Sequence, residues 1–227
     1  MRQSRGERPY VVPTDCIRIG LYINHSFVEI NDVFAKWDVA FHGTPIEGAN
    51  VIFKSGAQLL KAGDITLGGN VLGVRPGHIT SVFERTNLYT KKKEMFDKDQ
   101  IFSSPSLIYS FDDCYAKPFD LAVNGGKPSR AKVAFQLRQR PGSYNIGQET
   151  VGAKKEIDPM ISNNELEYYT KENIAIVVYG LLVKVEGITT IIEVARLPAD
   201  KVAKMVSSRK SKPEQIDLNP SYTILNF

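Results

Sequence analysis

The alternation of apolar and polar residues predicts a chain with more strands than helices. Residues 16–24 alternate over their first half, which is the spacing of a half-buried strand. Residues 27–30 and 33–34 are expected to pair with this strand around a turn at Asn31-Asp32. The predicted strands are residues 16–24, 27–30, 33–34, 37–41, 101–104, 131–138, 165–169, 174–185 (with a bulge at Gly180) and 189–196.

Helices are predicted at three places. Apolar residues at helical spacing favour a helix over residues 45–60. A second helix is expected to begin at Pro105, because proline is tolerated in a first turn, and a third covers residues 198–208. The second helix would carry Ser106, Tyr109 and Tyr115. Because strands and helices do not alternate regularly, the pattern favours an α+β fold with mostly antiparallel strands.

The order of these elements suggests three parts. Residues 1–36 form an N-terminal arm, loose over residues 1–13, followed by lead-in strands. Residues 37–197 form the main domain. Residues 198–227 form a short helix and a polar tail.

Composition narrows the class of protein. Hydrophobic residues make up 42% of the 227 residues, which is enough for a sizeable core. The net charge of +4 permits an anionic ligand or partner without requiring nucleic acid. Two cysteines can build neither a disulfide framework nor a zinc site by themselves. With no apolar run of membrane-span or signal-peptide length, we expect an intracellular protein, cytoplasmic or nuclear, without a membrane partner.

Two motifs carry candidate chemistry at the ends of predicted strands. His42-Gly43-Thr44 is expected to form a turn after the strand over residues 37–41, where the glycine would let a ligand approach the backbone. The alternative is a histidine buried in the core. Glu165 and Glu167 would share one face of a strand, where only a polar site or solvent tolerates two carboxylates cheaply. The alternative is an exposed edge strand.

Together with the Ser106-x-x-Tyr109 segment, these motifs resemble the ADP-ribosyltransferase superfamily, on its poly(ADP-ribose) polymerase and diphtheria-toxin side. The resemblance covers about residues 37–186. It implies that the main domain is catalytic and is built on a split, mostly antiparallel β-sheet with a few flanking helices. It also implies NAD as the donor, no metal, and transfer of a single ADP-ribose to a macromolecular acceptor, protein or nucleic acid, by a monomer.

The resemblance also implies roles for particular residues. His42 would hold a ribose hydroxyl, and Gly43, within the His-Gly-Thr motif that ends at Thr44, would bind the nicotinamide amide. Ser106 would bond the same amide, and Tyr109, or Tyr115 in its place, would stack on the ring. Such roles suit a planar amide, which needs donors, acceptors and a flat partner.

Glu167 would stabilise the ribosyl cation as nicotinamide leaves, and Glu165 would orient the acceptor. A carboxylate suits the first role because positive charge develops in the transition state. The alternative exchanges the two glutamates.

Other positions extend or weaken the resemblance. Arg75 and His78, in a glycine-rich segment, could meet the cofactor pyrophosphate. The family's strand tyrosine is replaced here by Phe102 or Ile101. Two alternatives therefore stay open: a catalytically inactive binding module with the same fold, and an enzyme like the RNA 2′-phosphotransferases.

Overall fold

The chain is an α+β protein with mostly antiparallel strands, as the sequence predicts. Its computed structural model describes residues 2–61, 64–65, 83–86, 91–96, 99–121 and 129–186. The central sheet has the order β3-β12-β9-β4, and β8 also pairs with β9. Its strands are β3 (Ile17–Gly20), β4 (Asp38–Thr44), β8 (Phe119–Leu121), β9 (Ser129–Gln139) and β12 (Ile176–Val185), all paired antiparallel.

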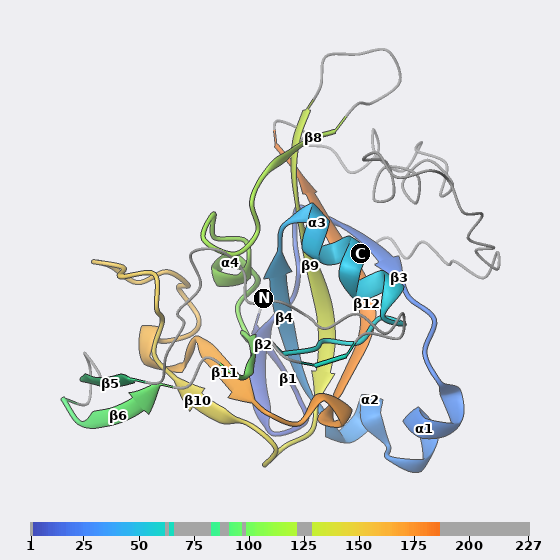
Figure 1. Cartoon of the computed structure of the whole chain (residues 1–227), viewed down its shortest axis with the longest axis horizontal. Helices are drawn as coiled ribbons and strands as arrows, with labels where there is room; N and C mark the ends of the chain where they lie inside the picture. The colour runs from blue at the N-terminus through green and yellow to red at the C-terminus, as the bar shows by residue number, and fades with distance from the viewer. Residues whose placement is uncertain are drawn as a thin grey trace.

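A second sheet lies beside the first (Figure 1). Its order is β10-β11-β7, formed by β7 (Ile101–Ser103), β10 (Asn145–Gly147) and β11 (Glu167–Thr170). The two sheets meet at Phe41 and Ser104, whose backbones exchange two hydrogen bonds of 2.7 and 2.9 Å. This junction places the His42 motif beside the second sheet, in which β7 carries Phe102 and β11 carries Glu167.

Helices cover both faces of the central sheet, so its long strands are buried on both sides. On one face lies α3 (Ile46–Lys54), whose Phe53 ring contacts Phe135 of β9 edge-on at 5.4 Å. On the other face lies α4 (Leu107–Ser110), whose Leu107 packs with Phe41. Figure 1 shows α3 in front of the sheet and α4 to its left. This two-sided burial explains the near-continuous apolar run of β12.

The N-terminal residues are not a loose arm, contrary to expectation. They form a hairpin of β1 (Arg2–Arg5) and β2 (Arg8–Val11). Asp38, fully buried in β4, accepts hydrogen bonds from the backbone amides of Glu7 and Arg8 at 2.7 and 2.8 Å and from the Tyr144 hydroxyl at 2.6 Å. A buried carboxylate requires such donors, and here they fix the hairpin turn against the sheet.

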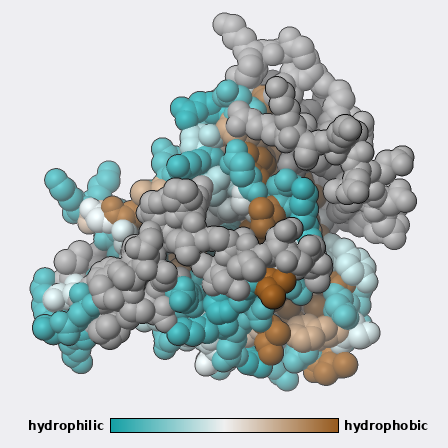
Figure 2. Space-filling view, in the orientation of Figure 1, coloured by the Kyte–Doolittle hydropathy of each residue, from teal (hydrophilic) through white to brown (hydrophobic). Residues whose placement is uncertain are grey.

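The strands predicted at residues 27–30 and 33–34 are helices, so that expectation is wrong. They are α1 (His25–Ile30) and α2 (Val33–Lys36). Asn24 caps α1 by accepting a hydrogen bond from the Phe27 amide at 3.0 Å, and this local cap outweighs the strand tendency of the sequence. Figure 2 shows brown, apolar atoms gathered over the part of the molecule where Figure 1 places these helices, and Ile30 is 83% exposed.

The remaining elements agree with the sequence only in part. The bulge at Gly180 is confirmed, because the register of β12 against β9 shifts between Val178 and Gly180. The helix predicted from Pro105 is a single turn, and Tyr115 lies beyond it. The strand over 189–196 and the helix over 198–208 lie outside the described residues. The other described elements are β5 (Phe83–Thr86), β6 (Lys93–Phe96) and the short helices η1 (Asn163–Glu165) and η2 (Asn173–Ala175).

Among the helices in the described part of the chain, none has both the length and the apolar character needed to cross a membrane.

Candidate functional site

A hydrogen-bonded cluster surrounds the carboxylate of Glu167, the first residue of β11. Its Oε1 atom accepts hydrogen bonds from the Thr150 hydroxyl at 3.0 Å and from the Tyr109 hydroxyl at 3.2 Å. The Tyr115 hydroxyl lies 2.6 Å from that of Tyr109 and 2.8 Å from that of Thr150. The carboxylate of Glu167 and three hydroxyl side chains, those of Tyr109, Tyr115 and Thr150, therefore form one hydrogen-bonded group from three separate segments. We call these four residues the Glu167 cluster.

The Glu167 cluster runs from the interior to the surface. Glu167 and Tyr109 are buried, at 3% and 2% exposure. Tyr115 is half-buried and Thr150 is exposed, so a molecule in solvent can reach the cluster from their side.

Burial, followed by the negative charge of Glu167, raises the pKa of both tyrosine hydroxyls above the ordinary range. At neutral pH, both tyrosines therefore stay protonated and can donate hydrogen bonds to the carboxylate.

Ser106 lies next to this cluster but its hydroxyl is already occupied. It is fully buried and caps α4 by accepting a hydrogen bond from the Tyr109 amide at 3.2 Å. The same hydroxyl donates to Asp158 Oδ2 at 2.5 Å. Asp158 belongs to residues 148–162, which also supply Ile157 and Ile161 to the apolar cluster around Tyr109. This segment therefore covers both residues that the family resemblance assigns to nicotinamide.

His42 is the fifth residue of β4, so the motif ends a strand and does not form the expected turn. Its Nδ1 lies 2.8 Å from the Phe102 carbonyl oxygen, and because a carbonyl can only accept, Nδ1 carries a proton. Burial lowers the pKa of His42, which favours the neutral ring.

The structure does not bring His42 and Glu167 together. His42 opposes Phe135 across β4 and β9, and directly opposed residues point to the same face. Phe135 shares its core cluster with Tyr168. Because Glu167 precedes Tyr168 in the same strand, its side chain points to the other face, where α4 lies.

Gly43 has a packing role in this structure. A Cβ atom there would lie 1.7 Å from the carbonyl oxygen of Ser110, so the glycine lets β4 and α4 approach closely. The following residue, Thr44, is buried, and its hydroxyl lies 2.2 Å from where a Cβ on Gly48 would be. The close neighbours of the motif on these sides belong to the protein itself.

The two glutamates do not share a strand face, contrary to expectation. Glu165 ends the short helix η1 and is exposed, whereas β11 begins only at Glu167, which is buried. Because Glu165 lies outside the strand, the alternation of side chains along a strand does not determine where it points. The two carboxylates are separated by their environments, and the buried one belongs to the Glu167 cluster.

The other predicted site residues lie apart from this cluster or cannot be placed. Phe102 is half-buried in β7, with its ring 6.4 Å from that of Tyr169. Arg75 and His78 lie outside the described residues. Within the described ranges, no group of three or more histidine, cysteine, aspartate or glutamate side chains is arranged to hold a metal ion.

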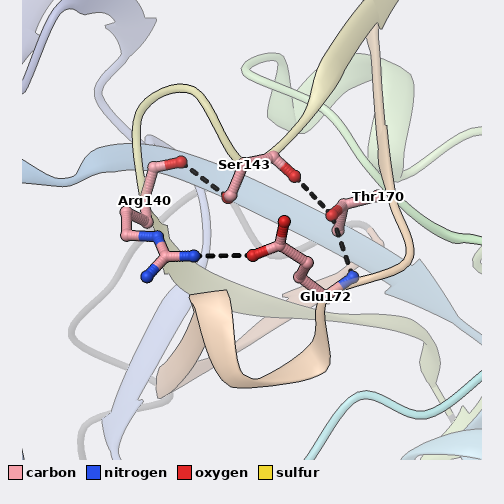
Figure 3. Close-up of polar contacts among 4 residues, drawn as sticks. All are labelled: Arg140, Ser143, Thr170 and Glu172. Atoms are coloured by element: carbon pink, nitrogen blue, oxygen red, sulfur yellow. Dashed lines mark hydrogen bonds and ion pairs between the residues drawn. The ribbon is translucent and has the colours of Figure 1, made fainter.

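A polar pocket of about 330 Å³ lies at the opposite end of β11 from Glu167. Figure 3 shows the contacts there: Arg140 pairs with Glu172 at 2.6 Å, and the Thr170 hydroxyl donates to the Ser143 carbonyl at 2.5 Å. These contacts tie the turn between β9 and β10 to the end of β11. No predicted site residue lines this pocket, and three of its lining residues, Ser143, Thr170 and Glu172, bond to one another or to Arg140.

The sequence does not indicate the roles of Thr150 and Asp158. Both lie in residues 148–162, a stretch without the period of a helix or a strand, so periodicity gives them no signal. Their importance depends on contacts with α4 and β11, which only the folded structure brings near. For the chain as a whole, no model of a known protein family matches, and no solved structure matches at a significant level.

Proposed function

We propose that this protein transfers ADP-ribose from NAD to a macromolecular acceptor, with Glu167 as the catalytic carboxylate. One observation carries the proposal: the Glu167 carboxylate is buried, and hydroxyl donors from Thr150 and Tyr109 fix its Oε1 atom. A preorganised negative charge stabilises a cation that develops in a transition state. The ribose of NAD becomes such a cation when nicotinamide leaves.

The proposed reaction uses this charge in one step. The bond between C1′ of the ribose and the nicotinamide nitrogen breaks, and its electron pair leaves with nicotinamide. Glu167 stabilises the oxocarbenium-like ribose, as carboxylates do in glycoside cleavage. A nucleophilic atom of the acceptor then bonds to C1′ and releases its proton to solvent, while water in its place gives hydrolysis.

We propose that NAD enters on the side of Tyr115 and Thr150, because in the Glu167 cluster Tyr115 is half-buried and Thr150 is exposed. The proposal does not rest on His42, whose side chain leaves the other face of the sheet. Glu165, which ends η1 two residues before β11 and is exposed to solvent, is assigned to orienting the acceptor.

A specific observation favours a second candidate function, a binding module without catalysis. Ser106 and Tyr109 are 0% and 2% exposed beneath Ile157, Asp158 and Ile161, so a nicotinamide ring can contact them only after these three residues move. A module that never binds NAD has no need of such movement.

Nicotinamide release from NAD separates the two functions. The parent protein should release nicotinamide, and Glu167→Gln should do so at least a hundredfold more slowly, the scale expected for one electrostatic partner. Glu165→Gln is the matched control: it should keep hydrolysis and lose transfer to the acceptor. Equal hydrolysis by the parent and Glu167→Gln, or no release by a folded parent, would contradict the enzyme proposal.

A further inference from the structure

We propose that Thr150 is a positioning residue that holds the Glu167 carboxylate in its productive orientation. This inference deepens the proposed function and rests on it for its kinetic consequence. Thr150 reaches the cluster through two of its own groups. Its hydroxyl donates to Glu167 Oε1 at 3.0 Å, and its backbone amide donates to the Tyr109 hydroxyl at 2.9 Å.

The proton inventory of the cluster explains why both groups matter. Each hydroxyl of Tyr109, Tyr115 and Thr150 owns one proton, and an ionised carboxylate only accepts. The backbone amide of Thr150 donates to the Tyr109 oxygen, which is the acceptor in that hydrogen bond. The Tyr109 hydroxyl uses its own proton to donate to Glu167 Oε1. The Tyr115 hydroxyl then donates to Tyr109 or to Thr150, at 2.6 or 2.8 Å.

In this arrangement all three hydroxyl protons run toward the carboxylate. Two of them end directly on Oε1, one from Thr150 and one from Tyr109. If the Thr150 hydroxyl is removed, one direct donor is lost and Tyr115 keeps only Tyr109 as its partner within the cluster. The backbone amide of Thr150 stays in every substitution except proline, so replacing the side chain by valine or serine tests the hydroxyl alone.

The position of Thr150 makes this test clean. It is exposed, so replacing its side chain disturbs little packing, unlike a change at the buried Tyr109. Thr150→Val keeps the shape and removes the hydroxyl, whereas Thr150→Ser keeps the hydroxyl and removes a methyl group. A purely structural role would make both variants behave alike.

The kinetic experiment measures nicotinamide release from NAD by the parent, both Thr150 variants and Glu167→Gln. Thr150→Val should lower kcat roughly ten- to a hundredfold with little change in KM, because a hydrogen bond to a charged group is lost and ground-state binding is kept. Thr150→Ser should restore most of the rate. Parent-like kcat in Thr150→Val, with Glu167→Gln inactive, would overturn this inference and leave the proposed function standing.

Crystal structures of the two Thr150 variants supply a readout that does not need activity. The Glu167 carboxylate should turn away from its present orientation in Thr150→Val and keep it in Thr150→Ser. If the parent releases no nicotinamide, the proposed function fails, and the variant structures alone decide whether Thr150 positions Glu167. An unmoved carboxylate in Thr150→Val would overturn the inference in either case.

Discussion

Replacing Gly43 by alanine tests the packing that places α4 over the sheet. The new Cβ atom would lie 1.7 Å from the Ser110 carbonyl oxygen and 2.7 Å from its carbonyl carbon, both backbone atoms of α4. Contacts under 3.0 Å are essentially never seen for real Cβ atoms, so α4 must move. Overpacking of this kind costs up to about 3 kcal/mol. Alanine also restricts the unfolded chain more than glycine does, which stabilises the folded state by about 0.7 kcal/mol. The free energy of unfolding should therefore fall by about 2 kcal/mol.

The assay is urea unfolding, with Gly48→Ala as the matched control. A Cβ on Gly48 also meets a close atom, but that atom is the Thr44 hydroxyl at 2.2 Å, which can rotate away. Alanine in a helix gains about 1 kcal/mol over glycine, so Gly48→Ala should change the free energy of unfolding by less than about 1 kcal/mol. Because α4 carries Tyr109, Gly43→Ala should also slow nicotinamide release. Equal unfolding free energies for Gly43→Ala and the parent would refute this reasoning.

Two further predictions concern buried polar groups. Burial lowers the pKa of His42 in the folded protein, so the unfolded chain binds the proton more tightly than the folded chain does. The stability that neutral His42 contributes is therefore present above its ordinary pKa and is lost as the pH falls below that value. Urea unfolding at pH 7.5 and 5.5 should show a larger loss for the parent than for His42→Gln, by no more than about 1.4 kcal/mol per pH unit, and equal losses would contradict this. Asp38→Ala should lower the free energy of unfolding by about 3 kcal/mol in the same assay, because two backbone amides and the Tyr144 hydroxyl lose their acceptor. Tyr144→Phe removes only one of these hydrogen bonds and should lower it by about 1 kcal/mol. Similar losses for the two variants would argue against Asp38 as the anchor of the hairpin.

The sequence predicts the core strands well where burial decides the structure. Residues 174–185 carry a long apolar run and residues 131–138 are mainly apolar, and they form β12 and β9 because both faces of the central sheet are covered. Local capping is harder to anticipate from apolar spacing. Asn24 determines that residues 25–30 form α1, although the same residues satisfy a strand pattern.

The candidate site was predictable only residue by residue. Their motifs indicate Glu167 and Tyr109, but residue spacing does not show that Glu165 belongs to η1 and lies outside the strand. The sequence predicts room for a ligand at Gly43 and gives no sign of its neighbour Ser110, which is distant in the chain and close only after folding. No sequence pattern indicates Thr150, because its role depends on contacts with Tyr109 and Glu167, which lie in segments distant along the chain.

The most direct test of the central claim is a crystal structure of Glu167→Gln with NAD bound, since this variant should bind NAD and leave it intact. The account predicts the nicotinamide-ribose C1′ atom beside residue 167, with the ligand entering past Tyr115 and Thr150. Asp158 should be displaced from Ser106, while Thr150 stays hydrogen-bonded to residue 167. NAD bound in the pocket at the far end of β11, or a soaked crystal with no NAD at millimolar concentration, would contradict it.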